Sequence, residues 1–228
     1  FLGTDPTAPY SLTWTNAGEG PHQLTAVAVD NQLASGTSAP IPVTAQPFGG
    51  WLHQDVGAVA AAGGASYSGG TFTVVGSGEN IAGTAGEFHF VYVPVSGNAT
   101  IVARVAAIQN TSPEAKAGVM IRESLAANSG YASMFLMRSY GLRFQRRTAT
   151  GAGTINTSVS GVVAPHWVKL VRFGSTLTGF ASPDGVSWTF VGSAAVSMPS
   201  NVLVGLALTS RVDGVLNTST FDNAFFLT

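Results

Sequence analysis

The chain has 228 residues and a formal net charge of −1, and charged residues make up only 9% of it. Such a surface lacks the basic patch that nucleic acid or an anionic membrane surface attracts, so we expect neither as a partner. The absence of cysteine excludes disulfides, thiolate nucleophiles and cysteine metal sites. No run of about 18 apolar residues is present to span a membrane.

The first 46 residues alternate apolar and polar positions in segments separated by turn residues. The predicted strands are Tyr10–Thr15, His22–Asp30 and Ser38–Ala45. Pro40 and Pro42 place the third strand at a sheet edge, because proline cannot donate to a strand ladder. Residues 47–50 are expected to form a short linker.

The same segment contains the short motifs Leu2-Gly3-Thr4-Asp5, Ala8-Pro9-Tyr10-Ser11, Trp14-Thr15-Asn16 and Leu24-Thr25-Ala26-Val27-Ala28-Val29-Asp30-Asn31. Together they resemble the second half of a bacterial immunoglobulin-like repeat. The resemblance implies a partial sandwich, and about 46 residues cannot bury both faces of a sheet. The segment therefore docks on the next domain, pairs with another copy of the chain, or is the remnant of a larger domain.

Residues 51–228 contain about eleven further strand patterns and no amphipathic helical stretch. The predicted strands are Thr71–Ser77, Glu87–Val93, Thr100–Ile108, Lys116–Ser124, Tyr131–Arg138, Leu142–Thr148, His166–Phe173, Leu177–Ser182, Trp188–Val196, Val202–Thr209 and Thr220–Leu227. The glycine-rich stretch Ala61–Gly70 is expected to be a loop. So many strands predict two packed sheets, that is, an all-β jelly-roll sandwich.

This second segment carries a set of words spread over nearly its whole length: Trp51 with Asp55-Val56-Gly57, Gly70-Thr71-Phe72-Thr73-Val74, Phe88-His89-Phe90-Val91-Tyr92, Lys116-Ala117-Gly118-Val119-Met120-Ile121-Arg122, Trp167-Val168-Lys169-Leu170-Val171-Arg172 and Asp184-Gly185-Val186-Ser187-Trp188. The set resembles bacterial modules related to the concanavalin-like domain of unknown function 1349. That resemblance implies a concanavalin A-like jelly roll, similar to lectin and glycan-binding modules of secreted bacterial proteins. The Trp and Asp usual in that family are replaced here by Ala82 and Gly86.

Catalytic patterns are missing from the sequence. Glycoside hydrolysis needs two carboxylates flanking the scissile bond, and the acidic residues here are widely spaced. The four histidines form no metal-binding sequence motif, and no G-x-S-x-G nucleophile elbow is present. We therefore expect no catalytic residues, although a carboxylate pair assembled in space remains open.

Basic residues gather in the middle of the chain, with seven of the ten Lys and Arg between Arg104 and Arg147. Strand alternation puts Lys116, Met120 and Arg122 on one face of their strand, and Arg143, Gln145 and Arg147 on one face of theirs. If these strands are neighbours, an open sheet face offers guanidinium forks to glycan hydroxyls or carboxylates. The alternative is a solvated face on which arginine stems cover apolar surface.

Aromatic and acidic residues add two weaker expectations. Trp188 follows the Asp184-Gly185 turn and is expected to be partly exposed as a sugar-stacking ring, whereas Trp167 is expected in the core. The predicted ligand-binding set is Arg104, Lys116, Arg122, Arg138, Arg143, Gln145, Arg147 and Trp188. Asp55 and Asp222 approach each other if the sandwich closes, and would then hold a structural calcium ion, the one cofactor considered.

The leading hypothesis is a non-catalytic, lectin-like carbohydrate-binding module of a secreted or cell-surface bacterial protein, with a glycan or polysaccharide as its partner. The first alternative is a structural or adhesive extracellular module that self-associates through the incomplete immunoglobulin-like segment. The second is a glycoside hydrolase or polysaccharide lyase on the same scaffold.

Overall fold

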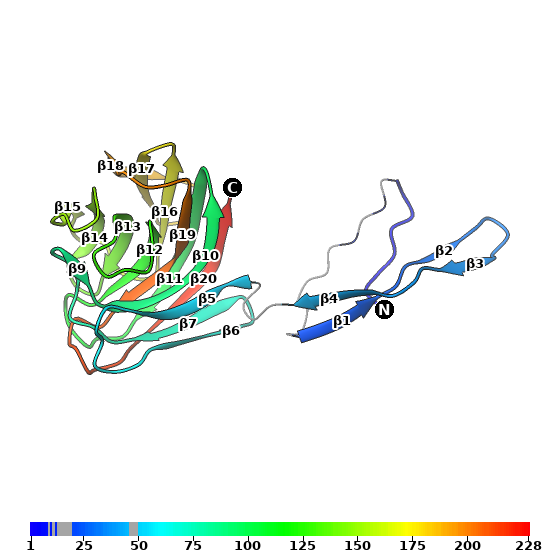
Figure 1. Ribbon diagram of the computed structural model, residues 1–228, viewed down its shortest axis with the longest axis horizontal. Helices are drawn as coiled ribbons and strands as arrows, with labels where there is room; N and C mark the ends of the chain where they lie inside the picture. Colours follow the sequence, from blue (N-terminus) through cyan, green and yellow to red (C-terminus); the bar gives the residue numbers. More distant parts are fainter. Residues whose placement is uncertain (9, 11, 13–19, 46–49) are drawn as a thin grey trace. The chain divides into compact units, whose positions relative to one another are not determined.

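A computed structural model describes residues 1–8, 10, 12, 20–45 and 50–228 (Figure 1). The chain divides into two compact units, Phe1–Trp51 and Leu52–Thr228, and each is described here by itself. Residues 47–49 of the predicted linker and much of the predicted strand Tyr10–Thr15 lie outside the described residues. No helix capable of crossing a membrane occurs in the part of the chain that the structure covers.

The first unit contains two separate two-stranded ladders. Strand β1 (Gly20–Leu24) pairs with β4 (Ile41–Ala45), and β2 (Val27–Val29) pairs with β3 (Ser35–Thr37). The predicted strand His22–Asp30 is thus broken at residues 25–26, and β3 was not predicted. The β2–β3 hairpin closes on Asp30, whose side chain accepts hydrogen bonds from the backbone N–H groups of Gln32 and Ala34.

The second unit consists of two seven-stranded antiparallel sheets that pack face to face. Sheet 1 has the order β15 (Ile155–Val159), β14 (Gly141–Arg147), β13 (Tyr131–Met137), β12 (Lys116–Arg122), β19 (Asn201–Thr209), β10 (Phe88–Ser96) and β5 (Leu52–Val56). Sheet 2 has the order β18 (Thr189–Ala195), β17 (Thr176–Ser182), β16 (His166–Phe173), β11 (Ala99–Ile108), β20 (Asn217–Leu227), β7 (Thr71–Gly76) and β6 (Gly64–Ser68). A short hairpin of β8 (Ile81–Ala82) and β9 (Ala85–Gly86) completes the unit. This is the predicted concanavalin-like jelly roll.

All eleven strands predicted after residue 51 are present, with ends shifted by a few residues. Strands β5, β6, β8, β9 and β15 were missed. Strand β6 corrects the loop expected at Ala61–Gly70: Gly64–Ser68 pairs with β7 although it is rich in small residues. A partner strand supplied the hydrogen bonds, and so overrode the low strand propensity of glycine and serine.

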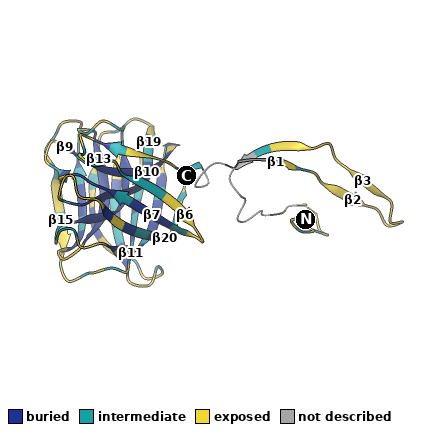
Figure 2. Cartoon of the chain, turned by 90° about the horizontal axis from the view of Figure 1, so that it is seen from below, coloured by how far each residue is buried: buried dark blue, intermediate teal, exposed yellow. Residues whose placement is uncertain are grey.

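The main core lies between the sheets, where every second residue of the central strands points inward. Ile101, Val105, Leu170 and Phe221 of sheet 2 are fully buried, as is Leu206 of sheet 1. Figure 2 shows these strands dark blue, whereas the described strands of the first unit carry much exposed surface. The alternating pattern of buried and half-buried residues in β7 and β16 is that of a sheet with one covered face.

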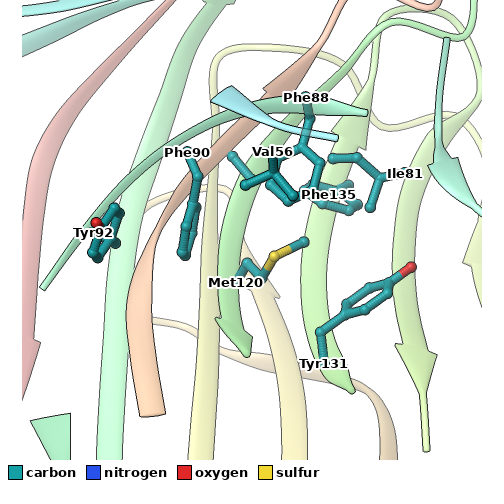
Figure 3. Packing of buried hydrophobic residues seen from close by; sticks show 9 residues of the cluster. Val56, Ile81, Phe88, Phe90, Tyr92, Met120, Tyr131 and Phe135 are labelled. Atoms are coloured by element: carbon teal, nitrogen blue, oxygen red, sulfur yellow. The ribbon is translucent and has the colours of Figure 1, made fainter. Parts of the chain in front are cut away.

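Sheet 1 differs, because its central strands are buried on both faces. Strands β12 and β13 have no exposed residue. A second apolar cluster on the outer face of sheet 1 contains Phe88, Phe90, Met120, Tyr131 and Phe135 (Figure 3). Ile81 of the β8–β9 hairpin packs into this cluster and is itself fully buried, so the hairpin covers the face.

Candidate functional site

The residues that strand alternation assigned to one face of β12 and one face of β14 do lie on the same face of sheet 1. Arg122, Tyr131 and Arg147 stand in register across β12, β13 and β14. Residues paired directly across antiparallel strands project to the same side. The same register puts Lys116, Arg143 and Gln145 on this side of the sheet.

This face is closed, and the predicted open ligand surface is wrong. Lys116, Arg122, Gln145 and Arg147 are each at most 2% exposed. They lie among the rings of the second apolar cluster, which itself has to be shielded from water, and the β8–β9 hairpin and adjoining loops cover both. The four side chains therefore bond to the protein's own backbone and polar groups and cannot receive a glycan.

Arg147 clamps three loops to sheet 1. Its five N–H groups each donate to a backbone carbonyl, at 3.0–3.1 Å: Nε to Ala152, Nη1 to Ala127 and Ser129, and Nη2 to Ala82 and Gly83. The guanidinium carbon also lies 5.2 Å from the centre of the Tyr131 ring. Every donor of this buried cation is satisfied, as a charge removed from water requires.

Lys116 holds the first strand of the hairpin. Its Nζ donates to Asn80 Oδ1 at 2.8 Å, to the Ile81 carbonyl at 3.1 Å and to Gln145 Oε1 at 3.1 Å. The amide of Gln145 donates to the same Ile81 carbonyl. Burial, reinforced by the charge of neighbouring Arg143, lowers the pKa of Lys116 to about 7.

Arg122 fixes the loop that follows its own strand. It donates to the carbonyls of Ser124 and Ala126, both at 2.5 Å. Its guanidinium carbon lies 5.0 Å from the centre of the Phe88 ring and 5.8 Å from that of Phe90. Burial lowers the pKa of Arg122 to about 10, so the group is charged at neutral pH.

The other predicted basic residues are dispersed. Arg138 follows the end of β13 on the opposite side from Lys116, is exposed, and borders a cavity of about 190 Å³. Arg104 belongs to sheet 2, where it forms a bidentate ion pair with Asp222. Arg143 stays near Lys116, and its buried Nε has no hydrogen-bond partner in the described part of the chain. These three residues therefore do not extend one ligand surface.

The structure does not bring together Asp55 and Asp222, the expected calcium ligands. Asp222 lies on the outer face of sheet 2 against Arg104, whereas Asp55 lies on the edge strand of sheet 1. There Asp55 accepts a hydrogen bond from His89 Nδ1 at 2.7 Å and two contacts from the backbone N–H of Gly63. Each carboxylate is engaged in its own sheet, so the predicted pairing is wrong.

Several other carboxylates also have structural partners. Glu114 pairs with Arg211, and Asp213 accepts from the backbone of Ala60. Asp184 accepts from the backbone N–H groups of two residues in its own turn. These bonds hold the pKa of Glu114, Asp213 and Asp184 below the ordinary values. A general acid instead needs a raised pKa.

A different surface, on the outer face of sheet 2, gathers accessible aromatic rings. The register aligns five residues across neighbouring strands in one row: Phe225, Val102, Lys169, Phe180 and Phe190. Phe190 is 60% exposed and Phe225 45% exposed. At about 4.8 Å per strand the row spans about 19 Å.

One end of this row together with the neighbouring Trp188 is here called the aromatic platform: Lys169, Phe180 and Phe190 on β16, β17 and β18, and Trp188 in the turn before β18. Lys169 Nζ lies 4.0 Å from the centre of the Trp188 ring and 4.8 Å from that of Phe180. Phe180 and Phe190 meet edge to face, with centroids 6.2 Å apart. Partial burial lowers the pKa of Lys169.

A rigid turn positions Trp188. Asp184 Oδ1 accepts from the backbone N–H groups of Val186 and Ser187 at 2.8 and 2.7 Å, and from the Ser182 hydroxyl at 2.8 Å. Gly185 has φ +78°, and a Cβ there would stand 2.8 Å from the ring of Trp167. The turn thus rests on Trp167 and leaves Trp188 beside Lys169.

The sequence contained the signal for this platform, but only Trp188 was selected from it. Trp188 is half-buried, as expected. Trp167 was expected in the core, yet it lies on the outer face and is half-buried under the Gly185 turn. Alternation in β16 places Trp167 and Lys169 opposite the buried Val168 and Leu170, a pattern that indicates the outer position of both.

Solved structures place the fold among known proteins, whereas two comparisons by sequence found no match. No protein-family model matches the chain, and no curated protein matches it either. Among solved structures, a functionally unknown protein from Saccharomyces cerevisiae is similar with a TM-score of 0.59 and 17% identity, over 78% of this chain and 95% of that one. The carbohydrate-binding module CBM66 from Bacillus subtilis has a TM-score of 0.51 and 15% identity, over 78% of this chain and 96% of that one.

An enzyme shares the same scaffold. A mutant of the GH43 protein BlXynB from Bacillus licheniformis is similar with a TM-score of 0.56 and 11% identity, over 89% of this chain and 46% of that one. This chain therefore matches about half of that enzyme. At such identities the similarity defines the jelly-roll fold alone.

Proposed function

We propose that the second unit is a non-catalytic carbohydrate-binding module of a secreted or cell-surface protein, and that it binds glycan on the aromatic platform. The observation that carries the proposal is the set of accessible rings on the outer face of sheet 2, where Phe190 is 60% and Phe225 45% exposed. Aromatic faces stack on the apolar faces of pyranose rings, while hydroxyls reach polar groups at the rim.

The surroundings of the platform support this proposal. Thr178 and Ser193 stand in the next row across β17 and β18, and their hydroxyls lie 2.9 Å apart. They offer donors and acceptors beside the rings. The Asp184 turn holds Trp188 in place before any ligand arrives, which lowers the ordering cost of binding.

The similar fold of a carbohydrate-binding module agrees with this function, and the engaged carboxylates of Glu114, Asp184, Asp213 and Asp222 favour binding over catalysis. The GH43 similarity keeps a hydrolase as the rival. Incubation of the purified chain with the polysaccharides that it retains, followed by an assay for reducing ends, distinguishes the two. Release of sugar at a rate that scales with protein concentration would contradict the proposal.

Retention on insoluble polysaccharides and titration with soluble ones test the platform. We expect Trp188→Ala and Phe190→Ala each to weaken binding at least tenfold, or about 1.4 kcal/mol. Tyr140→Ala is the matched control, because Tyr140 is a 53% exposed aromatic residue at the turn between β13 and β14. Equal losses in all three variants, or no retention by any polysaccharide, would refute the proposal.

Self-association through the first unit is a second candidate function, favoured by its exposed apolar side chains. Val27, Val29 and Ile41 are each about 60% exposed, on ladders in which the described residues form two strands each. Isolated two-stranded ladders are marginally stable in water. Light scattering of the full chain and of Val27→Ser/Val29→Ser tests this: a concentration-dependent dimer lost in the variant supports it, and a monomer in both cases contradicts it.

A further inference from the structure

A hydrogen-bonded triad of polar side chains, Asp55, His89 and His53, lies at the edge of the second unit where β5 pairs with β10. The Asp55 carboxylate contacts His89 Nδ1 at 2.7 Å, and His89 Nε2 lies 3.1 Å from His53 Nδ1. His89 is 1% exposed, Asp55 is about a quarter exposed and His53 is exposed. The triad therefore runs from the interior of the sandwich to solvent, and the proposed glycan binding does not use it.

Asp55 determines which nitrogen of His89 is available. A carboxylate only accepts hydrogen bonds, so His89 carries its proton on Nδ1 and presents the lone pair of Nε2 toward His53. Asp55 is itself fixed by the Gly63 N–H at 3.0 Å. A buried imidazole oriented by a carboxylate is the usual arrangement behind a metal-ligating histidine.

The spacing of the two rings fits two ligands of one ion. With metal–nitrogen distances of about 2.0–2.1 Å, two nitrogens lie about 3.3 Å apart in a tetrahedral site and about 2.9 Å apart in a square-planar one. The observed 3.1 Å between His89 Nε2 and His53 Nδ1 falls between these values. Because Asp55 leaves His89 Nε2 without a proton, His53 Nδ1 donates to it in the metal-free protein. Coordination by both nitrogens therefore requires the proton of His53 to sit on Nε2, which leaves the lone pair of Nδ1 for the ion.

We infer that His53 and His89 form a binding site for a first-row divalent cation such as Cu²⁺ or Zn²⁺, with Asp55 as the residue that positions His89. Imidazole nitrogen suits these ions, whereas calcium prefers oxygen ligands. The inferred site has two protein ligands, with water completing the coordination, since the described residues contain no cluster of three or more metal-ligating side chains. Such a site stays open to exchangeable ligands.

Titration of the full-length metal-free chain with CuCl₂ tests the site, followed by electron paramagnetic resonance of the one-equivalent complex. We expect one tight equivalent whose spectrum shows coupling to two imidazole nitrogens, and displacement of that copper by excess ZnCl₂. His53→Asn should lower the affinity at least tenfold and leave a single coupled nitrogen. Because His53 is exposed, the variant should keep its fold, and a melting curve of the metal-free variant verifies this.

Two further variants distinguish specific copper binding at this site from adventitious binding elsewhere on the protein. His166→Asn, at the start of β16, is the matched control and should bind copper as the wild type does. Asp55→Asn should retain both nitrogens in the spectrum with an affinity about tenfold lower, the effect of losing an orienting carboxylate. Copper binding that survives His53→Asn unchanged, or a wild-type spectrum with one coupled nitrogen, would overturn the inference.

Discussion

The two outer faces of the jelly roll differ in how far they are covered by other parts of the second unit. The outer face of sheet 1 carries Lys116, Arg122 and Arg147, and it is covered by the β8–β9 hairpin and neighbouring loops. The outer face of sheet 2 carries Phe190 and Phe225, which remain 60% and 45% exposed, and only the turn around Gly185 packs on it at Trp167. Strand alternation identifies which side chains share a face, but it does not reveal what covers that face.

The physical reason lies in what each face exposes. On sheet 1 the basic residues alternate with Phe88, Phe90 and Met120, and this much apolar area favours a cover. Once covered, each cation must find acceptors, and loop carbonyls provide them. On sheet 2 the rings are interspersed with hydroxyl residues, so the face remains compatible with water.

The largest expected effect comes from breaking the clamp on the covered face. Arg147→Met removes one donor from each of five backbone carbonyls in three loops, and we expect it to lower the free energy of unfolding by about 3–5 kcal/mol. Urea denaturation measures this loss. Arg138→Met, at an exposed arginine, should change stability by less than about 0.5 kcal/mol. Equal effects would mean that the cover does not depend on Arg147.

A second test uses the pH dependence of the same face. The unfolded chain keeps Lys116 protonated up to its ordinary pKa of 10.5, whereas the folded chain releases that proton from about pH 7. Stability should therefore rise with pH between these values, and be lost as pH falls toward 7, with a slope of up to about 1.4 kcal/mol per pH unit. Lys116→Met should remove this slope. Parallel stability curves for wild type and variant, measured between pH 6 and 10, would contradict the assignment.

Two glycine substitutions test how the turn before β18 packs on the outer face of sheet 2. Gly185→Ala places a methyl group against the Trp167 ring at φ +78°, and we expect a loss of about 1–3 kcal/mol together with a shift in tryptophan fluorescence. Gly161→Ala is the matched control, because Gly161 has φ +80° and no atom within 4 Å of the added methyl. It measures backbone strain alone. A Gly185→Ala variant no worse than Gly161→Ala would show that the turn does not bear on Trp167.

The smallest effect is expected where the platform is most accessible. Phe190→Ala removes a ring that is 60% exposed, so the free energy of unfolding should change by less than about 1 kcal/mol. Phe135→Ala, at a fully buried ring of the covered face, should cost about 3–5 kcal/mol. Thermal denaturation of the two variants compares the faces directly, and similar losses would mean that Phe190 is covered in solution.

The sequence predicted the jelly roll and the eleven longest strands of the second unit because their apolar alternation is strong. It missed β6 and β15, where Gly, Ser and Asn carry little strand preference and pairing alone decides the structure. It also predicted that Arg122 and Arg147 share a face. Their burial could not be predicted, because it depends on the β8–β9 hairpin, whose four strand residues carry no periodic pattern.

The candidate sites were only partly predictable for the same reason. Trp188 could be selected from its turn, but Phe180 and Phe190 join it only through cross-strand register. Asp55 was selected as an oxygen ligand for calcium with Asp222. Its actual contact, His89, lies 34 residues away and faces it through the β5–β10 pairing, which no local pattern encodes.

The five bonds of Arg147 have a consequence for motion. One guanidinium fastens the loops around Gly83, Ala127 and Ala152, and the backbone N–H groups of Gly86 and Gly151 add bonds to the loop between β12 and β13. None of these loops can lift away without breaking bonds that the others share. They should therefore open as one cooperative unit, and their amide protons should exchange with solvent at a common, slow rate.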